Sequence, residues 1–385
     1  MSDDWRHGGF GLYLHWPFCA AKCPYCDFNS HVAAAIDHDR WLRAYLAEID
    51  RIGAETQGRV LNTVFFGGGT PSLMTPETVA AVIDRLRATW PTANDLEITL
   101  EANPTSIDAG KFRAFAQGGV TRLSMGMQAM DDDSLRRLGR MHSAAEGRAA
   151  FDIARAHFPR VSFDLIYARQ GQSLDDWARE LRGALAMAVD HFSLYQLTIE
   201  DGTAFGRLFA AGKLRDLPED DLAADMYLKT QEICDAAGLP AYEVSNHARP
   251  GAECRHNLVY WRYGDYAGIG PGAHGRLTLG GVRHATEAPK SPADWLDRVE
   301  RLGNGEMPRE PLARQEQATE FLLFGLRLAE GIDPARYERL AGQALPAQAL
   351  ADLEAMGMIA RDAGRIRATA QGRAVLNAVI RALMP

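Results

Sequence analysis

Short apolar, β-branched runs alternate with amphipathic segments along the first two-thirds of the chain, and this alternation constrains the fold more than any other feature. Six runs have strand character, namely Gly11–His15, Leu61–Phe66, Leu96–Glu101, Arg122–Met125, Val161–Ile166 and His191–Thr198. Helical periodicity covers Trp41–Ile52, Pro76–Trp90, Ser134–Leu138, Ala144–His157 and Leu174–Ala188. Strands that alternate with helices indicate parallel βα units. Six units favour an α/β barrel or partial barrel over a flat doubly wound sheet, although periodicity alone does not separate the two.

The last third of the chain follows a different pattern. After about Tyr242 the alternation gives way to a Gly- and aromatic-rich stretch, HNLVYWRYGDYAGIGPGAHGR, and from about Ser291 the pattern is mainly helical. We therefore divide the chain into a barrel (1–245), a connecting region (246–290) and a C-terminal helical domain (291–385). The end of that domain, Ile332–Pro385, predicts two helices, a small hairpin and a last helix, as in a winged helix. Such a domain binds DNA only if its helix is basic and exposed, so we expect a lid or packing role instead.

Length and charge exclude several classes of protein. The 385 residues allow a sizeable core and roughly two to three domains. Lys and Arg number 42 against 50 Asp and Glu, and the net charge of −8 argues against a nucleic-acid partner. No secretory signal is visible, and no stretch approaches the about 20 apolar residues of a membrane-spanning helix. We expect a cytoplasmic protein.

Three of the five cysteines, Cys19, Cys23 and Cys26, lie within eight residues. An odd number with this clustering is a poor disulfide framework and is more typical of a metal site. A structural zinc site needs four ligands in paired spacing, and ferredoxin motifs also supply four thiolates. Three thiolates suit a four-iron cluster with one open iron, although unligated thiols are the simpler alternative. We expect Cys234 in the core of a helix, and leave Cys254 unassigned.

The cysteine spacing and its context, HWPFCAAKCPYCDFNSH, resemble the radical S-adenosylmethionine (SAM) superfamily. In that superfamily the open iron of a [4Fe–4S] cluster is chelated by the amino and carboxylate groups of SAM. The resemblance therefore implies a radical SAM barrel, a partial (β/α)6 fold, with both cofactors bound to it. It also implies that Tyr25, beside the last cysteine, lines the adenine site.

Further polar or glycine-rich positions follow the predicted strands. Gly67-Gly68-Gly69-Thr70 lets a ligand approach the backbone, although most glycine-rich turns are only turns. Glu101 ends the next strand, where a carboxylate can bind a ribose diol or simply be solvated. The order of these positions resembles the SAM contacts of oxygen-independent coproporphyrinogen III oxidase and its relatives. That resemblance implies a SAM site of Tyr13, Tyr25, Gly68, Gly69, Thr70, Glu101, Gln128, Arg140 and Asp164, of which Arg140 and Asp164 correspond to a second SAM position in the oxidase.

The sequence departs from the oxidase in three ways. Phe28 stands where the oxidase carries a further cysteine, and the oxidase's long N-terminal arm is missing. The third difference is a gain, because residues 256–261 form an HNxxYW motif that marks the related HemW-type heme chaperones. The resemblance to that family extends along nearly the whole chain. One local departure is Ala168-Arg169-Gln170, where Gly-Leu-Pro is more typical.

The HNxxYW motif predicts a heme site. Imidazole is a common axial ligand of heme iron, so His256 is the candidate ligand. Tyr260 and Trp261 can pack on the flat macrocycle, and Asn257 could bond the imidazole. The alternative is a hydrogen-bonded structural histidine among ordinary core aromatics. His274 is a weaker second candidate ligand, and we expect His15 to be structural.

The resemblance implies a heme chaperone that passes heme to an acceptor hemoprotein, such as one of the respiratory chain. It also implies a monomer–dimer equilibrium, and a role for the cluster in handover or dimerisation rather than in catalysis. The rival is an enzyme, the oxygen-independent coproporphyrinogen III oxidase, which decarboxylates its substrate through an adenosyl radical. A third class is a radical enzyme that acts on an unrelated small substrate.

Overall fold

The structure is a computed structural model that describes residues 3–106, 108–187 and 190–384. Its main sheet contains eleven strands among these residues. They are β1 (Phe10–Trp16), β4 (Leu61–Gly68), β5 (Thr92–Ala102), β6 (Arg122–Gln128), β7 (Arg160–Tyr167), β8 (His191–Gln196), β9 (Asn246–Ala248), β10 (Asp265–Ile269), β11 (His274–Leu279), β12 (Val282–Glu287) and β13 (Glu310–Pro311). Two small sheets pair β2 (Phe18–Cys19) with β3 (His31–Val32), and β14 (Ile359–Asp362) with β15 (Arg365–Ala368).

Helices follow most of the strands. Those of the first 302 residues are α1 (His38–Glu55), α2 (Pro76–Thr89), α3 (Ala109–Gln117), α4 (Asp132–Arg137), α5 (Ala144–His157), α6 (Leu174–Leu185), α7 (Ala204–Ala210), α8 (Asp220–Ala236), α9 (Arg255–Trp261) and α10 (Pro292–Leu302). The C-terminal helices are α11 (Arg314–Gly325), α12 (Pro334–Ala341), α13 (Ala347–Ala355), α14 (Ala370–Ala374) and α15 (Leu376–Leu383). Short 3-10 turns are η1 (Asp4–His7), η2 (Pro71–Leu73) and η3 (Pro104–Ser106). The expected end of α6 at Ala188 lies outside the described residues.

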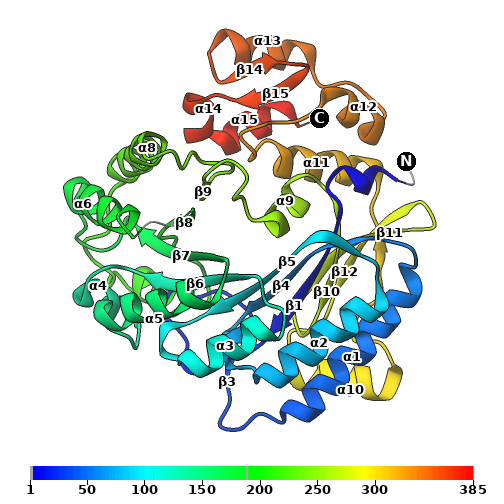
Figure 1. The fold of residues 1–385 in the computed structure, drawn as a ribbon. Helices are drawn as coiled ribbons and strands as arrows, with labels where there is room; N and C mark the ends of the chain where they lie inside the picture. Colours follow the sequence, from blue (N-terminus) through cyan, green and yellow to red (C-terminus); the bar gives the residue numbers. More distant parts are fainter. Residues whose placement is uncertain (1–2, 107, 188–189, 385) are drawn as a thin grey trace.

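The sheet curves into an open barrel. Strands β1 and β4 to β8 are adjacent in chain order and parallel, and β10 joins β1 from the other side, also parallel. Antiparallel strands end the sheet on both sides, β9 at one edge and β11 to β13 at the other, so the barrel does not close. The helices between the parallel strands cover the outside of the curved sheet (Figure 1). These features confirm the predicted α/β fold with a partial parallel barrel.

Residues 246–290 return to the barrel sheet and contribute β9 to β12. No strand was predicted here, because the stretch is rich in glycine, which has low strand propensity and lies within β10 and β11. Close packing requires these glycines: a Cβ atom on Gly268 of β10 would lie 2.2 Å from the carbonyl oxygen of His274. The same segment carries α9, which packs against the inner face of β4 and β1, inside the barrel (Figure 1).

Glu97 on β5 fixes α9 inside the barrel. Its carboxylate accepts hydrogen bonds from the backbone N–H groups of Arg255 (2.8 Å) and His256 (3.4 Å), and it pairs with Arg122 (3.2 Å). A carboxylate at this end of a helix satisfies free N–H groups and is favoured by the helix dipole. Glu97 thereby sets the position of the HNxxYW residues relative to the sheet.

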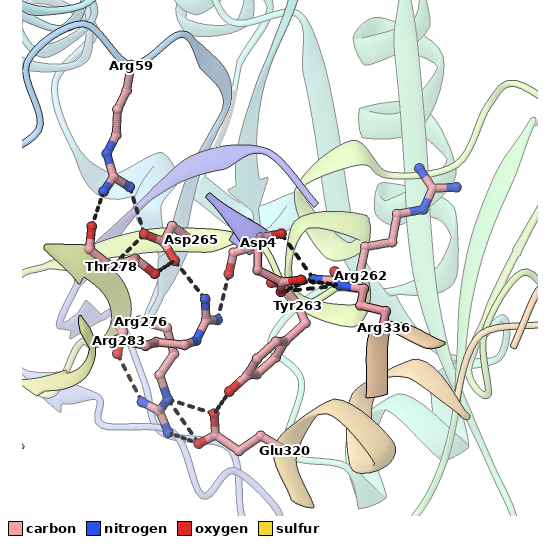
Figure 2. Close-up of polar contacts among 12 residues, drawn as sticks. Asp4, Arg59, Arg262, Tyr263, Asp265, Arg276, Thr278, Arg283, Glu320 and Arg336 are labelled. Carbon is pink, nitrogen blue, oxygen red and sulfur yellow. Dashed lines mark hydrogen bonds and ion pairs between the residues drawn. The ribbon is translucent and has the colours of Figure 1, made fainter. Parts of the chain in front are cut away.

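The C-terminal domain has its own hydrophobic core and the expected order of two helices, a hairpin and final helices. Several ion pairs and hydrogen bonds connect it to the barrel (Figure 2). Arg336 of α12 pairs with Asp4 at 2.8 Å, and Arg276 of β11 pairs with Glu320 of α11 at 2.7 Å. The hydroxyl of Tyr263 donates to Glu320 at 3.1 Å. These contacts hold the domain against the barrel.

The loop after β7 contains a strained residue. Ala168 has φ 56°, a left-handed conformation that costs a residue with a Cβ atom about 1–2 kcal/mol. The neighbouring Arg169 is buried, donating to the carbonyl of Ile166 (2.6 Å) and to Glu180 (2.6 Å). Glycine, which has no Cβ atom, would avoid the strain at this position.

We expect Ala168→Gly to stabilise the protein by about 0.5–1 kcal/mol, because relief of strain exceeds the entropy that glycine adds to the unfolded chain. Guanidinium denaturation of both proteins measures this difference in the free energy of unfolding. Ala149, exposed on α5, is the matched control. Ala149→Gly should destabilise by about 0.5–1 kcal/mol, as in any helix interior. A destabilising Ala168→Gly would contradict the strain argument.

Candidate cofactor site and aromatic cavity

The three clustered cysteines lie on the loop that follows β1, at the carboxyl end of the parallel strands. All three are free and half-buried. The hydroxyl of Thr70 donates to Cys19 Sγ (3.3 Å), and the guanidinium of Arg140 donates to Cys23 Sγ (3.3 Å). Burial raises the pKa of the Cys19 and Cys26 thiols. The site therefore offers three sulfur ligands with polar hydrogens aimed at two of them.

The thiols are not arranged around one point. Among the described residues, no three His, Cys, Asp or Glu side chains converge as ligands of a single metal ion. A cubane cluster does not require convergence, because each thiolate binds a different iron atom. The arrangement and chemistry of the donors thus fit a [4Fe–4S] cluster.

A cavity next to the thiols, which we call the cofactor cavity, gathers most of the predicted SAM residues. It is lined by Cys19, Cys23, Tyr25, Cys26, Gly68, Gly69, Thr70, Glu101, Gln128, Arg140 and Asp164. Sequence analysis missed other lining residues, among them Phe28, Ser30, Asn103 and Ser124. Ser124 lies four positions before Gln128 on β6, and the two-residue alternation of a strand places both on one face, a signal that could have revealed it.

Two backbone features shape this cavity. Gly68 has φ 107°, and a Cβ atom on Gly69 would lie 2.6 Å from the carbonyl oxygen of Phe18. Only glycine therefore allows the strand end to approach the cysteine loop so closely. Gln128 is also left-handed, with φ 70°, after a shift in the pairing of β6 and β7. Strain of this kind is found at binding sites that fix a side-chain direction.

The cofactor cavity holds two carboxyl groups and one guanidinium. Burial and, to a smaller extent, the charge of Asp164 raise the pKa of Glu101 to about 8, and the backbone N–H of Gly68 opposes the shift. Burial also raises the pKa of Asp164 to about 6. Arg140 is held by the carbonyl of Gly126 at 2.7 Å. Carboxyl groups with such pKa values in a cavity are typical of ligand sites.

A second cavity, which we call the aromatic cavity, opens beside the first and has a volume of about 420 Å³. The two cavities share Phe28, Gly68 and Glu101. The other lining residues are Tyr13, His15, Asn29, Tyr260, Trp261, Tyr266, Gly272, His274 and Phe324. Tyr13, predicted for the SAM site, lies here instead, and its hydroxyl contacts His15 Nδ1 at 3.0 Å.

The motif histidine lies below the aromatic cavity. His256 is 1% exposed and stacks on Phe65. Its Nδ1 is 2.8 Å from the hydroxyl of Thr63, and its Nε2 is 2.5 Å from the hydroxyl of Tyr260. Complete burial lowers its pKa to about 3, so the ring stays neutral. Asn257 does not bond the imidazole as expected, because its amide donates to the Tyr242 hydroxyl at 3.3 Å.

The structure also places the two other histidines and the two other cysteines that the sequence analysis named. His15 is structural, as expected, with Nε2 bonded to the carbonyl of Asn29 at 2.8 Å. His274 is exposed at the start of β11, and its side chain borders the aromatic cavity. Cys234 lies in the core, as expected. Cys254 is buried at the N-cap of α9, away from the three-cysteine loop, and its thiol lies 3.6 Å from the carboxylate of Glu97.

Comparisons with known proteins agree with this geometry. Residues 13–182 match the family model of the radical SAM superfamily, and residues 312–375 match that of the HemN C-terminal domain. The solved structure of coproporphyrinogen III oxidase (HemN) from Escherichia coli superimposes with a TM-score of 0.81 over 100% of this chain and 92% of that chain. At 22% identity this likeness shows the fold alone. Fold and site together define a radical SAM protein.

Sequence similarity is more specific. The heme chaperone HemW of Mycobacterium tuberculosis (strain ATCC 25618 / H37Rv) is 39% identical over 97% of this chain and 95% of its own length. The mitochondrial radical S-adenosyl methionine domain-containing protein 1 of Bos taurus is 38% identical over 97% of this chain and 87% of its own length. The chain belongs to the HemW family of radical SAM proteins. None of the helices in the described residues is both long and apolar enough to span a membrane.

Proposed function

We propose that the protein is a heme chaperone that binds heme beside a SAM-ligated [4Fe–4S] cluster and delivers heme to an acceptor hemoprotein. The observation that carries this proposal is the aromatic cavity, which adjoins the cofactor cavity in a chain similar along its length to heme chaperones. An acceptor in the respiratory chain, a homodimer and a cytoplasmic location remain predictions.

The chain's own residues supply the cofactor site in this proposal. Cys19, Cys23 and Cys26 would hold three irons and leave the fourth for SAM. When bound, this pair of cofactors supplies one-electron chemistry. Arg140 would offer its charge to the carboxylate of SAM, and Glu101 would accept hydrogen bonds from the ribose hydroxyls. Tyr25 presents its ring to the adenine.

Phe28 supports a binding role over decarboxylation of a porphyrinogen. Its side chain is 58% exposed and borders both cavities. A phenyl ring can pack on a macrocycle but cannot donate a proton to a reacting group. The position between the two cavities therefore favours contact with a flat apolar cargo.

Anaerobic heme titration of the reconstituted protein tests the proposal. We expect saturable binding at one heme per chain, and transfer of that heme to an apo-hemoprotein. In parallel, incubation with SAM, reductant and coproporphyrinogen III should yield no protoporphyrinogen. Formation of protoporphyrinogen, or the absence of saturable heme binding, would overturn the chaperone proposal.

A further inference from the structure

The motif histidine is poorly placed to bind an iron atom. Both nitrogens of His256 are hydrogen-bonded, and the described residues that line the aromatic cavity do not include it. On its other side the ring lies against the backbone of β1, where a Cβ atom on Gly11 would be 3.3 Å from the imidazole. Coordination through Nε2 would require Tyr260 to leave, and would break a buried hydrogen bond.

His274 has the opposite properties. Its side chain is exposed at the aromatic cavity, and no described residue hydrogen-bonds to its ring. His15, the other imidazole of this cavity, has both nitrogens bonded, to Tyr13 and Asn29. His274 is thus the one imidazole among the described lining residues with nitrogens available to a ligand.

Hydrogen bonds from Asn29 connect the turn that precedes His274 to the cysteine loop. Asn29, close to Cys26 in the sequence, donates from its amide to the carbonyls of Pro271 and Lys290, both at 2.9 Å. Gly272 has φ 74°, and a Cβ atom there would lie 2.6 Å from the Asn29 amide nitrogen. Residues that present a metal ligand need this kind of support to hold its orientation.

Aromatic side chains face the same space as His274. Tyr260 and Tyr266 pack edge to face with ring centroids 4.5 Å apart, and Trp261 packs against Phe324 at 5.9 Å. Flat aromatic walls with one free imidazole match the chemistry of a heme, which is apolar on its faces and takes a nitrogen ligand at its iron.

We propose that His274, rather than His256, supplies the axial nitrogen to heme iron, and that the heme lies in the aromatic cavity against Trp261 and Tyr266. The bond formed is a coordinate bond from a neutral imidazole nitrogen, with no redox step. His256 is then a positioning residue that holds Tyr260, and through it one wall of the cavity. This inference rests on the proposed heme binding.

Hemin titration of three variants followed by visible spectroscopy tests the inference. His274→Ala should weaken hemin binding at least about tenfold, the lower end of losses seen when metal sites are altered, and shift the Soret band. Added imidazole should restore the band position of the parent, a rescue that a structural role would not show. His256→Gln, whose side-chain amide can replace the hydrogen bond from Nε2 to Tyr260, should give the parental band. His7→Ala, an exposed histidine outside the cavity, is the matched control.

Three results would overturn the inference. One is a His274→Ala variant that titrates like the parent; another is a shifted band that imidazole does not restore. The third is loss of the parental band in His256→Gln while His274→Ala keeps it, which would return the ligand role to the motif histidine. If the parent itself shows no saturable hemin binding, the proposed function fails as well, and the two failures are thereby distinguished.

Discussion

Cys23→Ala is expected to abolish iron–sulfur cluster assembly. The parent, reconstituted without oxygen, should contain about four irons and four sulfides per chain, and the variant close to none. Two thiolates on one loop cannot hold a cubane that already leaves one iron open. In the structure Cys23 is also the sulfur that Arg140 contacts, at 3.3 Å, so its loss removes a charge-supported ligand. Iron and sulfide analysis, together with the brown absorbance of the cluster, measures the outcome.

The matched control is a cysteine outside the loop, the buried Cys234 on α8. Cys234→Ala should retain the iron and sulfide content of the parent. Heme titration of Cys23→Ala should remain largely intact, because none of the three cysteines lines the aromatic cavity. Stoichiometric zinc in the parent, or a full cluster in Cys23→Ala, would refute the cluster assignment.

Asp265→Ala is expected to destabilise the protein by about 3–5 kcal/mol, the usual cost of removing one partner from a buried ion network. Asp265 is fully buried and accepts hydrogen bonds from Arg59 (2.7 Å) and Arg283 (2.7 Å) (Figure 2). It also accepts from the backbone N–H of Thr278 at 2.5 Å. Without the carboxylate, two guanidinium groups and a backbone donor stay buried without their charge partner.

Guanidinium denaturation measures this loss, with an exposed aspartate as the control. Asp297 forms only long surface contacts, with Arg40 at 3.8 Å and with Arg301 at 4.0 Å. Asp297→Ala should change the free energy of unfolding by less than about 0.5 kcal/mol. Equal effects of the two substitutions would show that the network in Figure 2 does not stabilise the fold.

The charged network around Asp265 extends to the C-terminal domain. Arg283 lies over the ring of Tyr263 at 3.9 Å, and Tyr263 bonds Glu320 of α11. The barrel edge and the domain therefore share one set of charges, and Phe324, one turn after Glu320, reaches the aromatic cavity. Heme bound there would contact both parts of the protein.

Much of the fold was predictable because short stretches of sequence specify its strands and helices. Apolar runs of strand length set the six parallel strands, and capping signals such as Thr75 before Pro76 set the helix starts. The cysteine loop and the positions after β4 and β5 were found for the same reason, since parallel strands bring their carboxyl ends to one edge. The strands β10 and β11 were missed because their glycines, Gly268 and Gly275, serve close contacts with neighbouring segments and have low strand propensity.

The sequence by itself determined the class of fold, the three thiolates and the residues that gather around them, because these depend on spacing along the chain. It could not decide which histidine is available to a ligand. His256 and His274 differ in burial and hydrogen bonding, and both properties depend on Thr63, Tyr260 and Asn29, which are distant from one or the other in the chain. Only the packing of α9 against the inside of the barrel buries one imidazole and leaves the other at the cavity.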